Sequence, residues 1–273
     1  NAATITTSTP VQDMVLAGTT LILKTASGTK TLSGVAMGRN DILSGSEDGT
    51  VVLSYATSTR NYFSTDISRS TSTNMGRFAG QPAGKAVFSF RPVPGDDTLF
   101  LAKDPTGLNL LRVPTGDILQ LSTSSVTSAA AAPGKIIWAI FDADTNASLL
   151  SAYDVRSQDR SSDFEFVPEQ ITSLLLLDSG DIFALTKGGA LYSLNFNQSS
   201  RVRLATNVRS MTLSGNSDKI AILNGKGAQI LFLRGNKPNL QIDLPNAARI
   251  QKLVWYRDNE HIFVQYPDRV AFL

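Results

Sequence analysis

The sequence predicts an all-β protein built from repeated antiparallel meanders, on two observations. The first is the stretch 171–206, in which turn-forming residues separate four short apolar runs. The runs are Ser173–Leu177, Ile182–Leu185, Ala190–Phe196 and Val202–Ala205. Apolar runs at such short intervals indicate a four-stranded antiparallel meander. The second is that variants of this unit recur along the whole chain, which is the pattern of a β-propeller, where one meander forms one blade.

Seven units follow when the repeats are aligned on the second strand, which starts each time after a polar turn. These second strands are Met14–Ala17, Ile42–Ser44, Leu99–Ala102, Ile136–Phe141, Ile182–Leu185, Ile220–Leu223 and Ile262–Val264. The units span about 1–33, 34–65, 86–122, 129–167, 171–206, 208–245 and 250–273. We therefore predict one domain, 1–273, folded as a seven-bladed β-propeller of four-stranded antiparallel blades.

The first two units are short, with glycine-containing hairpin turns. Their expected strands are Ala3–Thr6, Met14–Ala17, Thr20–Thr25 and Thr29–Ser33, then Gly34–Met37, Ile42–Ser44, Thr50–Tyr55 and Asn61–Ser64. Residues 66–85 follow, rich in Ser, Thr and Gly and without sustained alternation. Such long connections are uncommon and usually functional or disordered. We predict an insertion there, with a degraded eighth blade as the alternative.

The later units repeat the same order of turn and strand. Their expected strands are Ala86–Phe90, Leu99–Ala102, Leu108–Val113 and Ile118–Leu121; Ala129–Ala132, Ile136–Phe141, Ser148–Asp154 and Phe164–Val167; and Ser210–Leu213, Ile220–Leu223, Gln229–Leu233 and Leu240–Leu244. In the fifth unit, consecutive apolar residues at Leu174–Leu177 fit a strand that is packed on both faces.

The last unit appears one strand short. It offers Lys252–Tyr256, His261–Gln265 and Val270–Leu273. Either Ala2–Thr7 supplies the outer strand and closes the ring, or the blade has three strands or continues past the given sequence. We favour the second account, because the same N-terminal residues are the best inner strand of the first unit.

Composition excludes several kinds of function. The net charge is +2, with 18% charged residues, which gives no strong attraction to nucleic acid. Cysteine is absent, so disulfides, thiol nucleophiles and cysteine-bound zinc are excluded. The sequence contains no apolar span long enough to predict direct membrane insertion. The Ser- and Thr-rich, charge-poor composition favours an extracytoplasmic or cell-envelope location over the cytoplasm.

Three arginines each follow an expected inner strand: Arg39, Arg91 and Arg257. On one rim they could hold a carboxylate or phosphate ligand through forked hydrogen bonds. The alternative is local ion pairing with neighbouring acidic residues. In the 66–85 insertion, an aromatic residue lies among cations, a composition typical of contact surfaces. The residues concerned are Arg69, Arg77, Phe78 and Lys85.

The run Asp142, Asp144, Asn146 and Ser148 places oxygen side chains at alternate positions, as a calcium loop requires. Ala147 stands where such loops have glycine, and Leu150 and Tyr153 stand where ligands would fall, so a plain hairpin turn is the alternative. No other cofactor is expected. His261 is the only histidine and begins an apolar run, which favours a structural role over a catalytic one.

The final stretch LVWYRDNEHIFVQYPDRVAFL, Leu253–Leu273, resembles propeller repeats of envelope-anchored bacterial proteins that carry PEGA-type domains. The whole chain resembles the broad β-propeller class without its sharper signatures. There is no Gly-His to Trp-Asp pair, no kelch double glycine and no repeated tryptophan of the quinoprotein dehydrogenases. The resemblance implies a membrane-tethered interaction module.

We therefore predict a non-catalytic recognition module for a protein or cell-envelope ligand, bound through the side that carries 66–85. One alternative is a carbohydrate-active enzyme with channel-lining carboxylates as acid and base, although Asp178, Asp181 and Asp218 are expected in turns. The other is an assembly subunit that accepts a neighbour's strand at its incomplete blade.

Overall fold

A computed structural model describes most of the chain. The described residues are 11–17, 20–25, 28–31, 36, 40–46, 48–77, 89–105, 107–195, 198, 200–234, 237–256 and 258–273. The chain divides by its internal contacts into two compact units, 1–126 and 127–273. That the two units form one domain stays a prediction.

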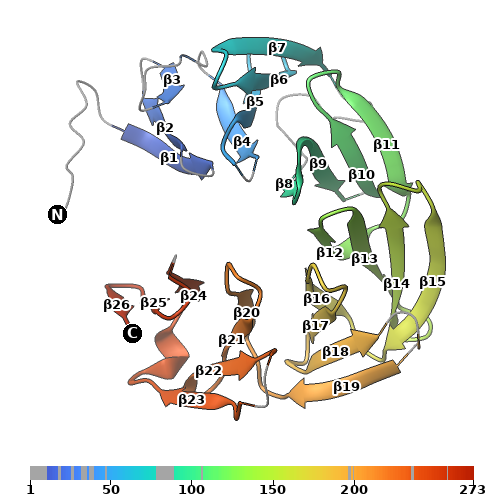
Figure 1. Cartoon of the computed structure of the whole chain (residues 1–273), viewed down its shortest axis with the longest axis vertical. Coiled ribbons are helices and arrows are strands. Elements are labelled where there is room, and N and C mark those ends of the chain that lie inside the picture. Colours follow the sequence, from blue (N-terminus) through green and yellow to red (C-terminus); the bar gives the residue numbers. More distant parts are fainter. Residues whose placement is uncertain are drawn as a thin grey trace. The chain divides into compact units, whose positions relative to one another are not determined.

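The first unit contains three antiparallel sheets (Figure 1). One has the strands β1 (Val11–Ala17), β2 (Thr20–Thr25) and β3 (Gly28–Thr31). The next has β4 (Asp41–Gly45), β5 (Val51–Ala56), β6 (Asn61–Asp66) and β7 (Thr71–Gly76). The third has β8 (Ser89–Val93), β9 (Asp96–Asp104), β10 (Gly107–Arg112) and β11 (Asp117–Ser122).

The second unit contains four antiparallel sheets, and β12 begins at its boundary. The first is β12 (Val126–Ala132), β13 (Lys135–Asp142), β14 (Ala147–Asp154) and β15 (Arg160–Val167). The second is β16 (Ile171–Leu176), β17 (Ile182–Thr186), β18 (Leu191–Asn195) and β19 (Ser200–Ala205). The third is β20 (Ser210–Leu213), β21 (Lys219–Leu223), β22 (Gly227–Phe232) and β23 (Leu240–Asp243). The last is β24 (Lys252–Trp255), β25 (Ile262–Gln265) and β26 (Val270–Phe272).

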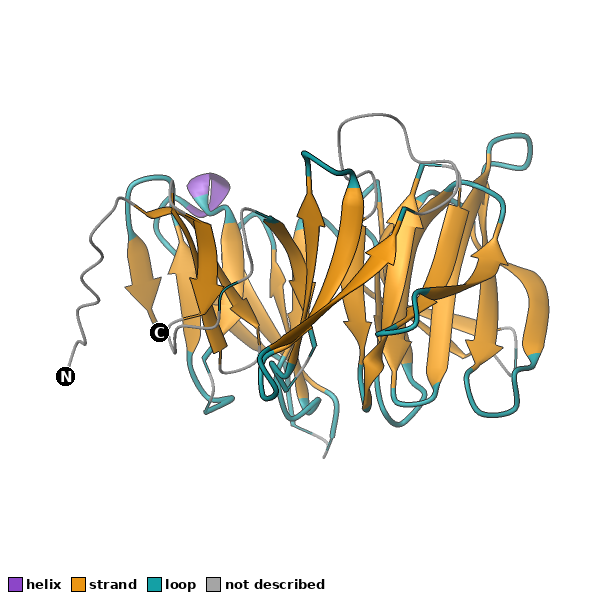
Figure 2. Ribbon diagram, turned by 90° about the horizontal axis from the view of Figure 1, so that it is seen from above, coloured by secondary structure: helices purple, strands orange, loops and turns teal. Residues whose placement is uncertain are grey.

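Strands joined by short turns account for nearly all of the described residues, as Figure 2 shows. The one described helix is a single 3-10 turn, Ala247–Arg249, so no helix in this part of the chain is long and apolar enough to span a bilayer. The meander order that the sequence predicted for the third to seventh units is confirmed, strand by strand. The last sheet has three strands, as predicted.

The second of the seven predicted repeats, 34–65, differs from its prediction. Its first strand is β4, and not Gly34–Met37, of which only Ala36 is described, as an isolated bridge residue. Its fourth strand is β7, which lies inside the predicted insertion and pairs with β6. Four of the six side chains of β7 are exposed. An edge strand without a buried face lacks the apolar alternation by which strands are recognised. The predicted inner strand Ala3–Thr6 lies outside the described residues.

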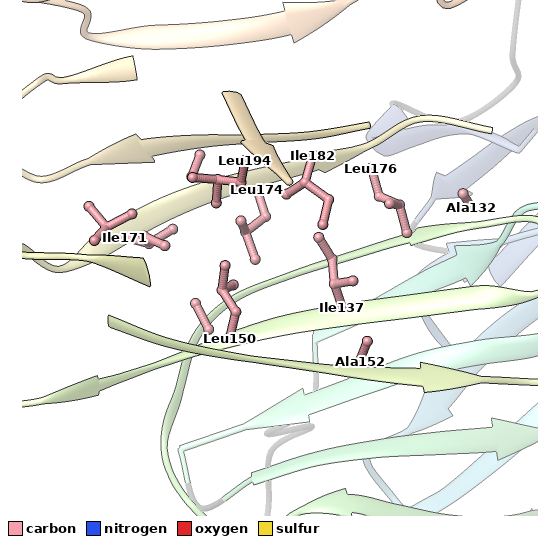
Figure 3. Packing of buried hydrophobic residues seen from close by; sticks show 12 residues of the cluster. Ala132, Ile137, Leu150, Ala152, Ile171, Leu174, Leu176, Ile182 and Leu194 are labelled. Atoms are coloured by element: carbon pink, nitrogen blue, oxygen red, sulfur yellow. The ribbon is translucent and has the colours of Figure 1, made fainter. Parts of the chain in front are cut away.

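Neighbouring sheets of the second unit pack face to face. Between the β12–β15 and β16–β19 sheets lies an apolar cluster that includes Leu174 and Leu176 (Figure 3). Leu177, just beyond the end of β16, packs instead between the β16–β19 and β20–β23 sheets. Because successive side chains of a strand point to opposite faces, β16 contributes to both cores. The predicted strand with two buried faces is confirmed.

Side chains also bond one sheet to the backbone of the next. The buried Ser148 hydroxyl donates to Glu169 O at 2.6 Å and accepts from Ile171 N at 2.9 Å. Further along, Trp255 Nε1 donates to Thr212 O at 3.1 Å. Such bonds satisfy main-chain groups that the sheets bury, and they fix how far one sheet can slide over the next.

Candidate functional site

Large exposed apolar side chains concentrate at the end of the second unit. Those described as exposed there are Leu240, Val254, Val270, Phe272 and Leu273. Val270 is 62% exposed and Phe272 52%. We call Val254, Val270 and Phe272 the end surface. Contiguous exposed apolar patches on soluble proteins mark interaction sites more often than single exposed residues do.

The face of the last sheet that points away from the β20–β23 sheet is aromatic. Ala271 packs against that neighbouring sheet, so Phe272, the next residue of β26, points to the opposite face. There the Phe272 ring lies 5.0 Å from the Phe263 ring and 5.6 Å from the Tyr256 ring, between ring centroids. His261 stacks on Phe272 at 5.0 Å. These mutual contacts give the exposed face a fixed shape.

The strand β26 has one unpaired edge within the described part of the chain. Ile262 and Leu273 exchange both main-chain hydrogen bonds, at 2.9 and 3.0 Å. In an antiparallel ladder, bonded and non-bonded pairs alternate. The non-bonded pairs here are Phe263 with Phe272 and Gln265 with Val270. The N–H and C=O groups of Phe272 and Val270 therefore point outward, away from β25.

An apolar pocket of about 130 Å³ lies beside this edge, between the last two sheets. It is lined by Lys219, Ile230, Phe232, Leu240, Ile242, Trp255, Glu260, Ile262 and Leu273. Trp255 pairs with Ile262, and Ile262 bonds to Leu273, so these three residues form one row across the last sheet. The row supplies one wall, and the outer strands of the β20–β23 sheet supply the other.

Two charged side chains line the pocket, Lys219 and Glu260, and Lys237 lies near it. Lys219 Nζ donates to Glu260 Oε1 at 2.8 Å and to Asn259 O at 2.9 Å, and lies 5.9 Å from the Trp255 ring centroid. Lys237 Nζ lies 5.6 Å from the centroid of Phe232, a lining residue. Lys237 has no ion pair with any described residue. The pocket is therefore apolar inside, with an unmatched cation near it.

The predicted arginine rim is only partly described, since Arg39 and Arg257 lie outside the described residues. Arg91 does not follow an inner strand but lies within one, β8, where it is exposed. Ser89 pairs with Lys103 of β9, which places Arg91 and Lys103 on the same face of the sheet. Burial, and then the Arg91 charge, lower the pKa of Lys103. Whether this surface binds an anion stays a prediction.

The cationic patch predicted on the insertion is also divided. Phe78 and Lys85 lie outside the described residues. Arg69 follows β6, is largely exposed, and faces Asp66 with 3.7 Å between Nε and Oδ2. Arg77 follows β7 and donates to Thr59 O at 3.1 Å. The two described arginines are therefore held at opposite ends of the outer strand rather than gathered in one loop.

The proposed calcium residues occupy the β13–β14 hairpin. Asp142 accepts from Asp144 N at 3.0 Å and from the Thr145 hydroxyl at 2.9 Å, as an Asp-initiated turn does. Asn146 has φ 52°, a conformation that asparagine tolerates. Ser148 points into the sheet packing and uses its hydroxyl there. No group of three metal-ligating side chains occurs among the described residues.

The carboxylates considered for catalysis lie in turns, as expected. Asp178 and Asp181 flank the β16–β17 turn, and Asp218 pairs with Arg234 at 3.2 Å. A closer pair occurs in the first unit, where Asp48 and Asp97 share a hydrogen bond. Partial burial, and then the Asp48 charge, raise the pKa of Asp97. Asp48 lies in the turn between β4 and β5, and Asp97 lies at the start of β9.

Sequence reasoning identified the incomplete last sheet but not the pocket. The pocket requires residues from five strands, one turn and the residue after β26, and their juxtaposition depends on pairing register across sheets. One signal was available. The apolar run Val270–Leu273 predicted a strand of the last sheet, but not the pocket that Leu273 lines.

No protein-family model matches the sequence, and no curated protein sequence matches it. Solved structures do match. The Dos1 propeller has 13% identity and a TM-score of 0.66, covering 97% of this chain and 78% of its own. Hydrazine synthase of Kuenenia stuttgartiensis has 10% identity and a TM-score of 0.57, covering 99% and 97%. PorZ, a bacterial surface component of the type-IX secretion system of Porphyromonas gingivalis, has 12% identity and a TM-score of 0.57, covering 97% and 36%.

At these identities the likeness shows the fold alone, which is that of a β-propeller. One of these structures is an enzyme and another is a surface component, so the fold does not select a function.

Proposed function

We propose that the protein is a non-catalytic recognition module that binds a partner protein through the end surface. The observation that carries the proposal is the concentration of exposed apolar side chains on and beside the last sheet, next to an apolar pocket. Interface cores are rich in aromatic residues and poor in charge. Phe272, held by Phe263 and Tyr256, offers such a core in a preformed shape.

Two equally exposed valines provide the test. Val270 belongs to the end surface, whereas Val202 lies on the outer strand β19, and each is 62% exposed. The immobilised chain is panned against a library of random peptides. We expect wild type and Val202→Asp to enrich the same peptides and Val270→Asp to lose them. Equal enrichment by all three proteins, or none by wild type, would end the proposal.

We further propose that the seven sheets are successive blades of a β-propeller, with the outward face of the last sheet left to a partner, and that the protein acts on the bacterial cell envelope. The likenesses that cover 97% or more of the chain support the first part. The Ser- and Thr-rich composition, with only 18% charged residues, supports the second. Fractionation of the source cells tests the location: recovery with the soluble cytoplasmic fraction alone would contradict it.

A further inference from the structure

A second, polar pocket of about 510 Å³ lies where the β17–β18 turn meets the connection from β19 to β20. We call it the turn pocket. It is lined by Thr172, Leu185, Thr186, Lys187, Gly188, Gly189, Asn207, Val208 and Arg209. The buried members are Leu185, Thr186, Gly189 and Val208, and the others are exposed. Pockets for small ligands usually measure about 300 to 1,000 Å³, so the turn pocket has the size of a ligand site.

A glycine brings the two sides of the turn pocket together. Gly189 has φ 81°, and a Cβ there would lie 3.0 Å from Val208 O, so only glycine fits. Val208 N donates to Gly189 O at 2.9 Å and ties the connection to the turn. Lys187 N donates to Gln170 O at 2.8 Å and fixes the start of the turn. The side chains of Lys187 and Arg209, from the two sides, therefore line one pocket.

The Arg209 guanidinium is held in place by neutral groups. Its Nη1 donates to Ala248 O at 3.1 Å and its Nη2 donates to Ala247 O at 2.6 Å, both in the single 3-10 turn. These carbonyls orient the guanidinium without neutralising its charge. A guanidinium has five N–H donors, so others remain for a ligand. Arg209 has no ion pair with any residue that the structure describes.

The lining of the turn pocket is positively charged. Lys187 and Arg209 line it, and none of the lining residues is acidic. Lys187 is exposed and forms no ion pair within the described ranges. The Asn207 side chain adds an amide donor. One carboxylate touches the turn, where Glu169 accepts from Gly188 N at 3.3 Å, but a single negative charge does not balance two cations.

We propose that the turn pocket binds a small organic molecule through a carboxylate or phosphate group, which Arg209 and Lys187 hold. Arginine presents paired donors that match either group, and lysine adds a point charge. The pocket is larger than an inorganic ion of a few atoms, so the rest of the molecule would lie over the buried Leu185 and Val208. This site shares no residue with the end surface and does not rest on the proposed function.

The first test is an NMR titration of the full chain at constant ionic strength. Glucose 6-phosphate and citrate supply the two anionic groups, and glucose is the neutral control. We expect at least one of the anions to shift the Gly188, Asn207 and Arg209 amides until they saturate, and glucose to shift none of them. The anion that saturates at the lower concentration shows whether phosphate or carboxylate is preferred. No saturable shift with either anion, or equal shifts with glucose, would overturn the proposal.

The second test measures how the two cations contribute. Arg209→Gln removes the charge but keeps an N–H donor for Ala247 O, and should bind the preferred anion about tenfold more weakly. Lys187→Ala should bind it about two- to fivefold more weakly. Lys226→Ala is the matched control, since Lys226 is an exposed lysine in the β21–β22 turn of the next sheet, and should bind as wild type does.

Thermal unfolding of each variant separates lost binding from lost folding, and Lys187→Ala, which changes an exposed side chain, should unfold as wild type does. Unchanged binding by Lys187→Ala and Arg209→Gln would overturn the site. Equal losses in Lys187→Ala and Lys226→Ala would also overturn it, because the anion would then respond only to the overall charge. Val270→Asp should bind the anion as wild type does, so this site and the end surface can fail independently.

Discussion

The β16–β19 sheet and the β24–β26 sheet are both antiparallel meanders, but they have different surroundings. The first has apolar clusters on both faces and a fourth strand on its edge. Among the described residues, the second has one such cluster, an exposed aromatic face, and an edge without a paired strand. A blade cannot bury both faces alone, so the same local structure becomes a core in one setting and a surface in the other.

The largest expected effect is on the free energy of unfolding, and it compares a core side chain of the β16–β19 sheet with an exposed side chain of the last sheet. Leu174→Ala removes a side chain that is 2% exposed within the cluster shared with β12–β15, and should lower the free energy of unfolding by about 2 to 5 kcal/mol. Phe272→Ala, on the open face, should cost no more than about 1 kcal/mol. Urea unfolding measures both variants. Equal losses would mean that the last sheet is covered like the other.

A smaller effect on stability should distinguish two buried hydroxyl groups of the β12–β15 sheet, one with hydrogen-bond partners and one without. Ser148→Ala leaves Ile171 N and Glu169 O without their partner and should cost about 1 to 3 kcal/mol. Ser151 is equally buried, but its hydroxyl has no partner among the described residues, so Ser151→Ala should be neutral or stabilising. Thermal unfolding of the pair checks this. A reversed order would refute the assigned bonds.

The smallest effect depends on pH and concerns the Asp48 and Asp97 pair. Because the folded-state pKa of Asp97 is raised, the folded chain binds this proton more tightly than the unfolded chain, and the stability it contributes is lost as pH rises through that pKa. Asp97→Asn keeps a hydrogen-bond donor and removes the repulsion. It should be more stable than wild type at pH 7, by at most about 0.5 kcal/mol after solvent screening, and equal to it near pH 3.

A constant difference between Asp97→Asn and wild type across this pH range would mean that Asp97 is not perturbed by its neighbour. Stability is followed by urea unfolding at each pH.

The sequence allowed most strands of the second unit to be predicted, because strands such as β16, β17 and β21 are buried and therefore apolar. It did not reveal β7, since its exposed Thr and Ser residues give no alternation. The candidate site was half predictable. The three described strands of the last sheet follow from its apolar runs, whereas the apolar pocket depends on which residues of different sheets come to lie opposite each other.

The most direct measurement compares peptide capture by wild type, Val270→Asp and Val202→Asp. The account predicts that only Val270→Asp loses the peptides that wild type enriches, because the two valines are equally exposed and only Val270 belongs to the end surface. Loss of capture by both variants, or by neither, would contradict it.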